Sequence, residues 1–197
     1  MKKWIFCVAT ILALCSGVSN ATALDDAVAA YDRGDYVRAI RLWRPMAEKG
    51  NALAQFSLGI MYANGRGVTQ NYREAVKWFR LVAAQGHVEA QNNLGLSYAN
   101  GYGVDQDYRE AARWFRLAAA QGLEDAQYNL GALYFNGQGL VKNYVRAHMW
   151  VSLAAAKGFG DAQKYRDEIA RTMTLTQIAE AQKLARECAK RNYKKCD

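Results

Sequence analysis

The sequence is poor in the residue types and motifs that most catalytic and metal sites need. It contains one proline and two histidines among 197 residues, and the two histidines, His87 and His148, are too far apart to form a metal-ligand pair. The sequence has no G-x-S-x-G motif, no P-loop, no dinucleotide-binding fingerprint and no S-x-x-K motif. We therefore expect no cofactor, no metal site and no enzymatic activity.

The N-terminal residues 1–23 have the pattern of a secretory signal peptide. Lys2 and Lys3 precede an apolar run over residues 4–14 that is too short to span a membrane, and Ala21-Thr22-Ala23 matches an A-x-A cleavage site. We expect a periplasmic or secreted protein that is cleaved near Ala23 and is not an integral membrane protein. An uncleaved N-terminal anchor is the alternative.

Cysteine is scarce, with four residues in the whole chain. Cys7 and Cys15 would leave with the signal peptide, so that Cys188 and Cys196 remain in the mature chain. An even number of cysteines in an oxidising compartment favours a disulfide, here between Cys188 and Cys196. Free thiols or a redox role are alternatives, although the sequence has no C-x-x-C motif.

What the chain does contain is an internal repeat. The stretches 58–86, 94–122 and 130–158 match one another at a shift of 36 positions, as Leu58, Leu94 and Leu130 show. A fixed period between 20 and 50 residues is typical of stacked repeat proteins.

Each copy predicts two helices joined by a glycine loop. Ala54, Leu58 and Tyr62 share one helical face, and an Asn-Gly pair ends this first helix in each copy. The second helix follows an N-cap residue and carries a Trp-aromatic or Trp-Val pair on its apolar face. The N-caps are Asn71, Asp107 and Asn143, and the mid-helix glycines that would allow close packing are Gly59, Gly95 and Gly131.

The spacing A-x-x-x-L-G-x-x-Y-x-x-G-x-G-V, followed by A-x-x-W-x-x-x-A-A-x-x-G, resembles the Sel-one-like repeat family, relatives of the tetratricopeptide repeat. Leu140, at the valine position of the third copy, is a small departure from the pattern. The resemblance implies an all-α fold, a right-handed α/α superhelix of helix-turn-helix repeats with a period of 36 residues. It also implies that the protein holds other proteins.

The repeats divide the mature chain into units. We expect an N-terminal capping pair of helices, in which Pro45 kinks the second helix, then three repeats, then C-terminal capping helices with a frayed basic tail. The corresponding ranges are 24–50, 51–86, 87–122, 123–158 and 159–197.

The first helices of a helix-pair solenoid line its concave side, so their outward positions are candidates for partner binding. An extended peptide or a helix would suit this surface, with amides holding backbone groups and aromatic rings as anchors. Alternatively, Phe56 and Tyr128 fill the core between repeats, and the asparagines serve only as helix caps. By comparison with the tetratricopeptide groove, the candidates are Leu53, Phe56, Ile60, Asn64, Glu89, Asn92, Leu96, Asn100, Asp125, Tyr128, Ala132, Phe135 and Asn136.

A basic ladder recurs on the successive second helices of a chain whose formal net charge is +8. It is either a solvated face that keeps the protein soluble or a surface that attracts an anionic envelope component. Its members are Arg41, Arg44, Lys77, Arg80, Arg113 and Arg116.

These features predict a non-enzymatic protein–protein interaction module, an adaptor or scaffold of the bacterial cell envelope. A protein or peptide is the expected partner, and a nucleic acid is not. A cell-wall-directed hydrolase or β-lactam-binding protein is one alternative, and a polyanion-binding surface protein is another.

Overall fold

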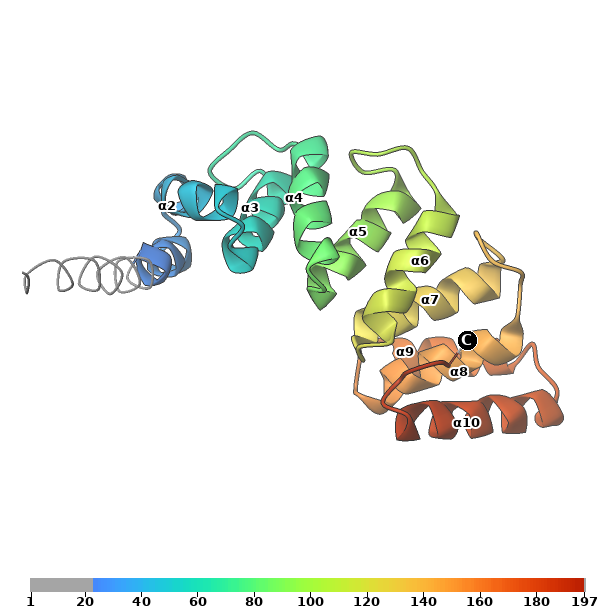
Figure 1. The fold of residues 1–197 in the computed structure, drawn as a ribbon. Helices are drawn as coiled ribbons and strands as arrows, with labels where there is room; N and C mark the ends of the chain where they lie inside the picture. The colour runs from blue at the N-terminus through green and yellow to red at the C-terminus, as the bar shows by residue number, and fades with distance from the viewer. Residues whose placement is uncertain (1–22, 197) are drawn as a thin grey trace, which may run out of the picture. The chain divides into compact units, whose positions relative to one another are not determined.

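The computed structural model describes residues 23–196. These residues form α-helices that are joined by short turns and loops, and they contain no strand (Figure 1). The predicted all-α fold with helix-turn-helix repeats is confirmed. The predicted signal peptide lies outside the described residues, except for Ala23. A helical segment over residues 23–32 is followed by α2 (Tyr36–Glu48), α3 (Ala52–Asn64), α4 (Tyr72–Ala84), α5 (Val88–Asn100), α6 (Tyr108–Ala119), α7 (Glu124–Asn136), α8 (Tyr144–Ala156), α9 (Ala162–Ala170) and α10 (Leu175–Lys190).

The chain forms two compact units that divide between Trp78 and Phe79, inside α4. In the first unit, α3 packs against α2, which continues to Glu48 across Pro45. In the second unit, α5 packs against α6, α6 against α7, α7 against α8, and α8 against both α9 and α10.

The helix ends follow the predicted capping residues. Gly65, Gly101 and Gly137 adopt the left-handed conformation with φ of 66°, 72° and 71°, directly after the asparagines that end α3, α5 and α7. The side chain of Asn143 accepts from the Arg146 amide at the start of α8.

The N-caps of the second helices act without the reciprocal bond of a capping box. The Asp107 side chain accepts from the Glu110 amide, but the Asp107 amide donates to the Tyr98 carbonyl at 2.9 Å and cannot bind the Glu110 carboxylate. The Glu110 carboxylate therefore turns to Arg113. The Asn71 amide is likewise taken by the Tyr62 carbonyl, so that the chain entering each second helix is tied to the helix before it.

The mid-helix glycines allow each second helix to approach its first helix closely. A Cβ placed on Gly95 would lie 2.6 Å from the Phe115 ring, and one on Gly131 would lie 2.5 Å from Cγ2 of Val151 and 3.1 Å from the Ala147 carbonyl oxygen. These separations are too short for any side chain, so glycine is required for the packing.

Buried glutamines join successive repeats. The Gln55 amide donates to the Ala47 carbonyl at 2.9 Å, and Gln91 and Gln127 make the equivalent bond to the second helix before them. Each glutamine adds a second hydrogen bond to a carbonyl at the end of a helix, because the amide of the glycine three residues on already donates to that carbonyl. The sequence analysis did not single out these glutamines, although they recur at the same period as the leucines.

The C-terminal tail is held in place, so the expectation that it is frayed was wrong. The predicted disulfide between Cys188 and Cys196 is present, and Cys188 is fully buried. The Cys196 carbonyl accepts from the Arg146 guanidinium at 3.2 Å, and the Tyr193 ring lies 4.8 Å from the Lys157 ammonium. A covalent bond, a hydrogen bond and a cation–π contact thus fold the basic tail back onto the repeats.

We predict that Gly131→Ala destabilises the protein by about 1–2 kcal/mol, because overpacking outweighs a gain of about 1 kcal/mol in helix propensity. Chemical denaturation measures the change. As a control, Val151→Ala removes the methyl group that the new Cβ would meet, so the double variant should lose less stability than the sum of the two single variants. A Gly131→Ala protein that is more stable than the parent would contradict the packing argument.

We predict that Cys196→Ser releases the tail and leaves the repeats folded. The loop closed by the disulfide is short, with a sequence separation of 8, so its loss acts locally. Limited proteolysis should cleave after Lys194 or Lys195 in the variant and spare these sites in the oxidised parent. Equal protection in both proteins would show that the noncovalent contacts suffice.

Candidate functional site

Within the first unit, the predicted groove positions lie on α3 and differ in their accessibility. Leu53 is 44% exposed, and Asn64 is exposed at the end of the helix. Phe56 and Ile60 are half-buried. This face of α3 therefore offers apolar and amide groups to solvent side by side.

On α5, one of the equivalent positions is buried and makes a contact within the protein. Glu89 and Asn100 are exposed and Leu96 is half-buried, but Asn92 is only 7% exposed and accepts from the Asn129 amide at 3.2 Å. Asn92 therefore helps join α5 to α7.

The predicted anchors of the third repeat form an aromatic cluster with the C-terminal cap. The Tyr128 ring on α7 lies 5.4 Å from Phe159 and 5.3 Å from Tyr165 on α9, while Phe135 lies 5.8 Å from Tyr165. Burial, with added repulsion from Tyr128 and Glu168, raises the pKa of Tyr165 to about 12. Tyr128 and Phe135 are half-buried, so each packs internally and still presents part of its ring to solvent.

The remaining candidates of the third repeat lie around this cluster. Ala132 is half-buried, and Asn136 is exposed as the last residue of α7. Asp125 is half-buried, and burial together with the neighbouring Glu124 raises the pKa of its carboxyl.

One row of the basic ladder contacts tyrosines of the following first helix. The Arg44, Arg80 and Arg116 guanidinium groups donate to tyrosine hydroxyls 18 residues onward, at 2.8, 2.8 and 3.0 Å. The acceptors are Tyr62, Tyr98 and Tyr134. The arginines and the tyrosines both recur once in each repeat. Their constant offset of 18 residues is the signal in the sequence that could have predicted these pairs.

The other row is closer to solvent and is partly paired within its own helix. Arg113 forms a salt bridge of 2.8 Å with Glu110 and stacks 4.1 Å from the Trp114 ring, and Lys77 forms a salt bridge with Glu74. Arg41 lines a surface depression of α2 together with Asp35 and Arg38. The ladder is therefore a set of structural contacts in one row and a mixed-charge surface in the other.

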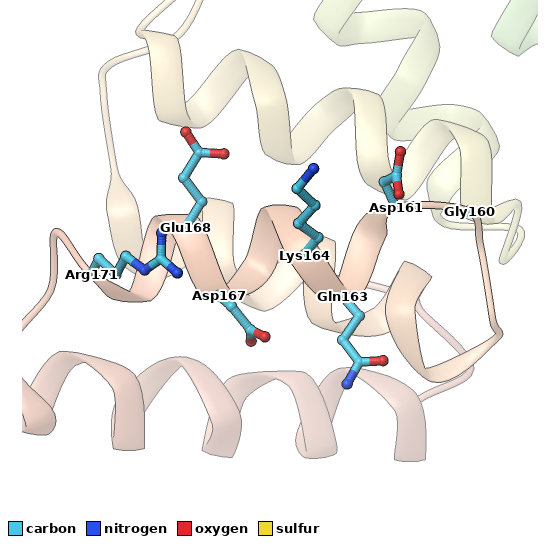
Figure 2. A pocket seen from close by; sticks show the side chains of 7 residues that line it. All are labelled: Gly160, Asp161, Gln163, Lys164, Asp167, Glu168 and Arg171. Atoms are coloured by element: carbon cyan, nitrogen blue, oxygen red, sulfur yellow. The ribbon is translucent and has the colours of Figure 1, made fainter.

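A surface depression of about 450 Å³ runs along α9 (Figure 2). Figure 2 shows Gln163 and Asp167 extending from one side of the helix, and Lys164 and Glu168 from the other. Carboxylates and cations alternate here, and all of these side chains are exposed, so the depression has no buried polar group that would fix the orientation of a ligand. We do not regard it as a binding site.

Across residues 23–196, no group of three or more His, Cys, Asp or Glu side chains is arranged to hold a metal ion. Over the same residues, none of the helices combines the length and the apolar character that crossing a membrane requires.

The repeats match a known family. The family model described as "Sel1 repeat" matches residues 30–51, 52–87, 88–123 and 124–159. A comparison with curated proteins gives no match.

Two solved structures are similar to this chain. One is a protective antigen present in uropathogenic Escherichia coli strains, described as displaying an SLR fold; it has 37% identity and a TM-score of 0.69 over 76% of this chain and 33% of that chain. The other is a Sel1 repeat protein from Oxalobacter formigenes, with 34% identity and a TM-score of 0.66 over 71% of this chain and 56% of that chain. The matched region is thus a third of the first protein and a little over half of the second.

We predict that the Arg80–Tyr98 contact stabilises the second unit by about 1 kcal/mol. A double-mutant cycle with Arg80→Met and Tyr98→Phe should show this coupling in denaturation experiments. Arg113→Met is the matched control, since it removes an arginine at the other row and should couple with Tyr98→Phe by less than about 0.3 kcal/mol. Equal coupling for both arginines would show that the contact is not specific.

Proposed function

Since the chain belongs to the Sel1 repeat family, whose members are generally protein–protein interaction modules, we propose that it is an exported adaptor of the bacterial cell envelope that holds a peptide or protein partner on its first helices. The family fold is typically a non-enzymatic scaffold. Family membership is established by the repeats, whereas the binding of a partner on the first helices and the location in the envelope are proposed.

The main support for this proposal is that exposed amide side chains recur at the same position of successive first helices. Within the second unit, Asn100 and Asn136 are exposed at the same position of α5 and α7, one repeat apart. An amide offers both a donor and an acceptor, which suits the backbone of an extended peptide. Within the first unit, α3 offers Leu53, at 44% exposure, and the exposed Asn64 on one face.

The second helices offer a weaker alternative surface. Arg80 and Arg116 already donate to tyrosines, and Arg113 is paired with Glu110. A partner that recruited these side chains would have to compete with contacts that hold the repeats together. On the first helices, the Asn100 amide donates to the Leu96 carbonyl of its own helix at 2.9 Å, so a partner that recruited it would not break a contact between repeats.

Export is supported by the signal-peptide pattern of residues 1–23 and by the Cys188–Cys196 disulfide, because disulfides persist in oxidising compartments. The similar protein from uropathogenic Escherichia coli is described as a protective antigen, and an envelope location of the present chain would be consistent with that relationship.

We predict that Asn136→Ala or Asn100→Ala weakens partner binding at least about tenfold, since each removes a contact from the proposed binding face of the second unit. The partner is first captured by cross-linking in the cell envelope and identified by mass spectrometry, and its affinity for purified variants is then measured by calorimetry. Leu117→Asp is the matched control, because Leu117 is 43% exposed on the second helix α6.

A change of less than about twofold for the control is expected. If Leu117→Asp weakens binding while both first-helix variants bind normally, the partner uses the second helices and the proposed binding face is wrong. Fractionation of cells that express the full chain tests export separately, and a cytoplasmic, uncleaved product would overturn the envelope assignment.

A further inference from the structure

The repeat pattern changes at several contacting positions at once where α8 meets the C-terminal helices. The Arg116 and Tyr134 pair of the preceding repeat is replaced by Ser152 and Ala170. Both replacements are small, so the space that a guanidinium and a phenol fill elsewhere is left open. An open cavity of about 430 Å³ occupies this place, and it differs from the depression along α9 because a buried polar side chain lies at its floor.

The walls of the cavity differ from the repeat pattern as well. His148 stands where the earlier repeats have Val76 and Ala112, and Arg166 and Asp167 stand where α7 has its core leucine and its mid-helix glycine. Asp167 cannot provide the close approach that a glycine allows, and α10 packs against α8 (Figure 1). The three helices α8, α9 and α10 thus line a cavity that is open to solvent on one side, and its lining residues are His148, Ser152, Arg166, Asp167, Ala170, Ile178, Gln182, Ala185 and Arg186.

The floor of the cavity carries a buried histidine. His148 is only 3% exposed, and its Nδ1 lies 3.2 Å from the Ser152 hydroxyl. Within residues 23–196, the structure shows no hydrogen-bond partner for Nε2. A neutral ring that accepts the serine proton at Nδ1 carries its own proton on Nε2, and so presents a donor to the cavity.

Ending a stack of repeats does not by itself account for this histidine. A terminal unit needs polar side chains on its exposed face, which explains Asp167 and Gln182. It does not explain a polar ring at a buried position where Val76 and Ala112 serve the other repeats. The burial of the ring has a cost, since burial and the nearby Arg166 lower the pKa of His148, with Asp167 opposing them.

The rim of the cavity is positively charged. Arg166 and Arg186 contribute two guanidinium groups against the single carboxylate of Asp167. Asp167 is already held by Arg166 at 2.7 Å, whereas Arg186 has no ion-pair partner in the described part of the chain. Gln182 adds an amide beside Arg186 on α10. The donors therefore outnumber the acceptors, and the excess charge favours an anion.

We propose that this cavity binds a carboxylate, supplied either by a small organic acid or by the C-terminus of a peptide. The Arg186 guanidinium binds the carboxylate as a planar fork, and Nε2–H of His148 donates to it from the floor while the Ser152 hydroxyl stays bonded to Nδ1 of the same ring. The volume accommodates the group that carries the carboxylate, which packs against Ile178 and Ala185. This site is separate from the proposed binding face of the first helices, so either proposal can fail without the other.

The two histidines of the chain make a direct test possible. Ring resonances of His148 and His87 are followed by NMR while the full mature protein is titrated with succinate, with inorganic phosphate, and with one short peptide carrying either a free or an amidated C-terminus. We expect saturable shifts of His148 and not of His87, with a dissociation constant at or below about 1 mM for succinate or for the free-carboxylate peptide. We also expect the pKa of His148 to rise when the carboxylate is bound, because an adjacent anion favours the charged ring.

Three variants control the experiment. Arg186→Gln should weaken binding at least about tenfold, because it removes a charge-assisted contact at an exposed position that folding does not need. Lys183→Gln, which removes the same charge from another exposed position of α10, should leave the affinity unchanged. The double substitution Ser152→Arg and Ala170→Tyr rebuilds the pair of the other repeats, and should fill the cavity and abolish binding while the thermal stability is kept.

Binding of succinate alone would identify a small acid as the ligand class, and binding of the free but not the amidated peptide would identify a chain terminus. The proposal is overturned if no carboxylate shifts His148 saturably, if phosphate binds more tightly than every carboxylate, or if Arg186→Gln and Lys183→Gln have equal effects.

Discussion

The absence of a side chain at one position of each first helix is the constraint on which the rest of the structure depends. At Gly95 and Gly131, the facing second helix comes so close that a Cβ would overlap a ring or a methyl group. This approach lets a residue such as Phe115 or Val151 become fully or almost fully buried. Since a single pair of helices cannot cover its whole apolar stripe, each pair must then pack against the next one.

Polar contacts give this packing its register. A buried glutamine binds the end of the preceding helix, and an arginine reaches the tyrosine of the following one, both at the same period. A buried amide that missed its carbonyl would lose a hydrogen bond without regaining water, so these residues favour one alignment of neighbouring helices over a slipped one. The ladder arginines therefore serve the fold before they serve any partner.

The same logic explains how the array ends. Asp167 stands at the glycine position of α9 and Arg166 at its leucine position, so a further pair of helices with the geometry of α7 and α8 cannot form. The long helix α10 covers α8 instead, and the disulfide and the contacts of Tyr193 hold the tail against the repeats. Ending the array in this way leaves a polar cavity, because α8 carries Ser152 where the preceding second helix has an arginine.

The helix pairs, their caps and the resemblance to the family followed from the sequence alone, because glycine, asparagine and apolar periodicity act over a few residues. The sequence favoured a bond between Cys188 and Cys196, and the structure contains it. Only the tertiary structure decided which outward residues remain accessible. The sequence predicted Asn92 and Tyr128 as groove residues. In the structure, Asn92 is buried against Asn129, and Tyr128 packs on Tyr165. The sequence gives no neighbour for His148, and its burial beside Ser152 where three helices meet is visible only in the structure. The physical reason is that periodicity fixes which face of a helix points inward, whereas the exposure of a side chain depends on residues that are distant in the chain.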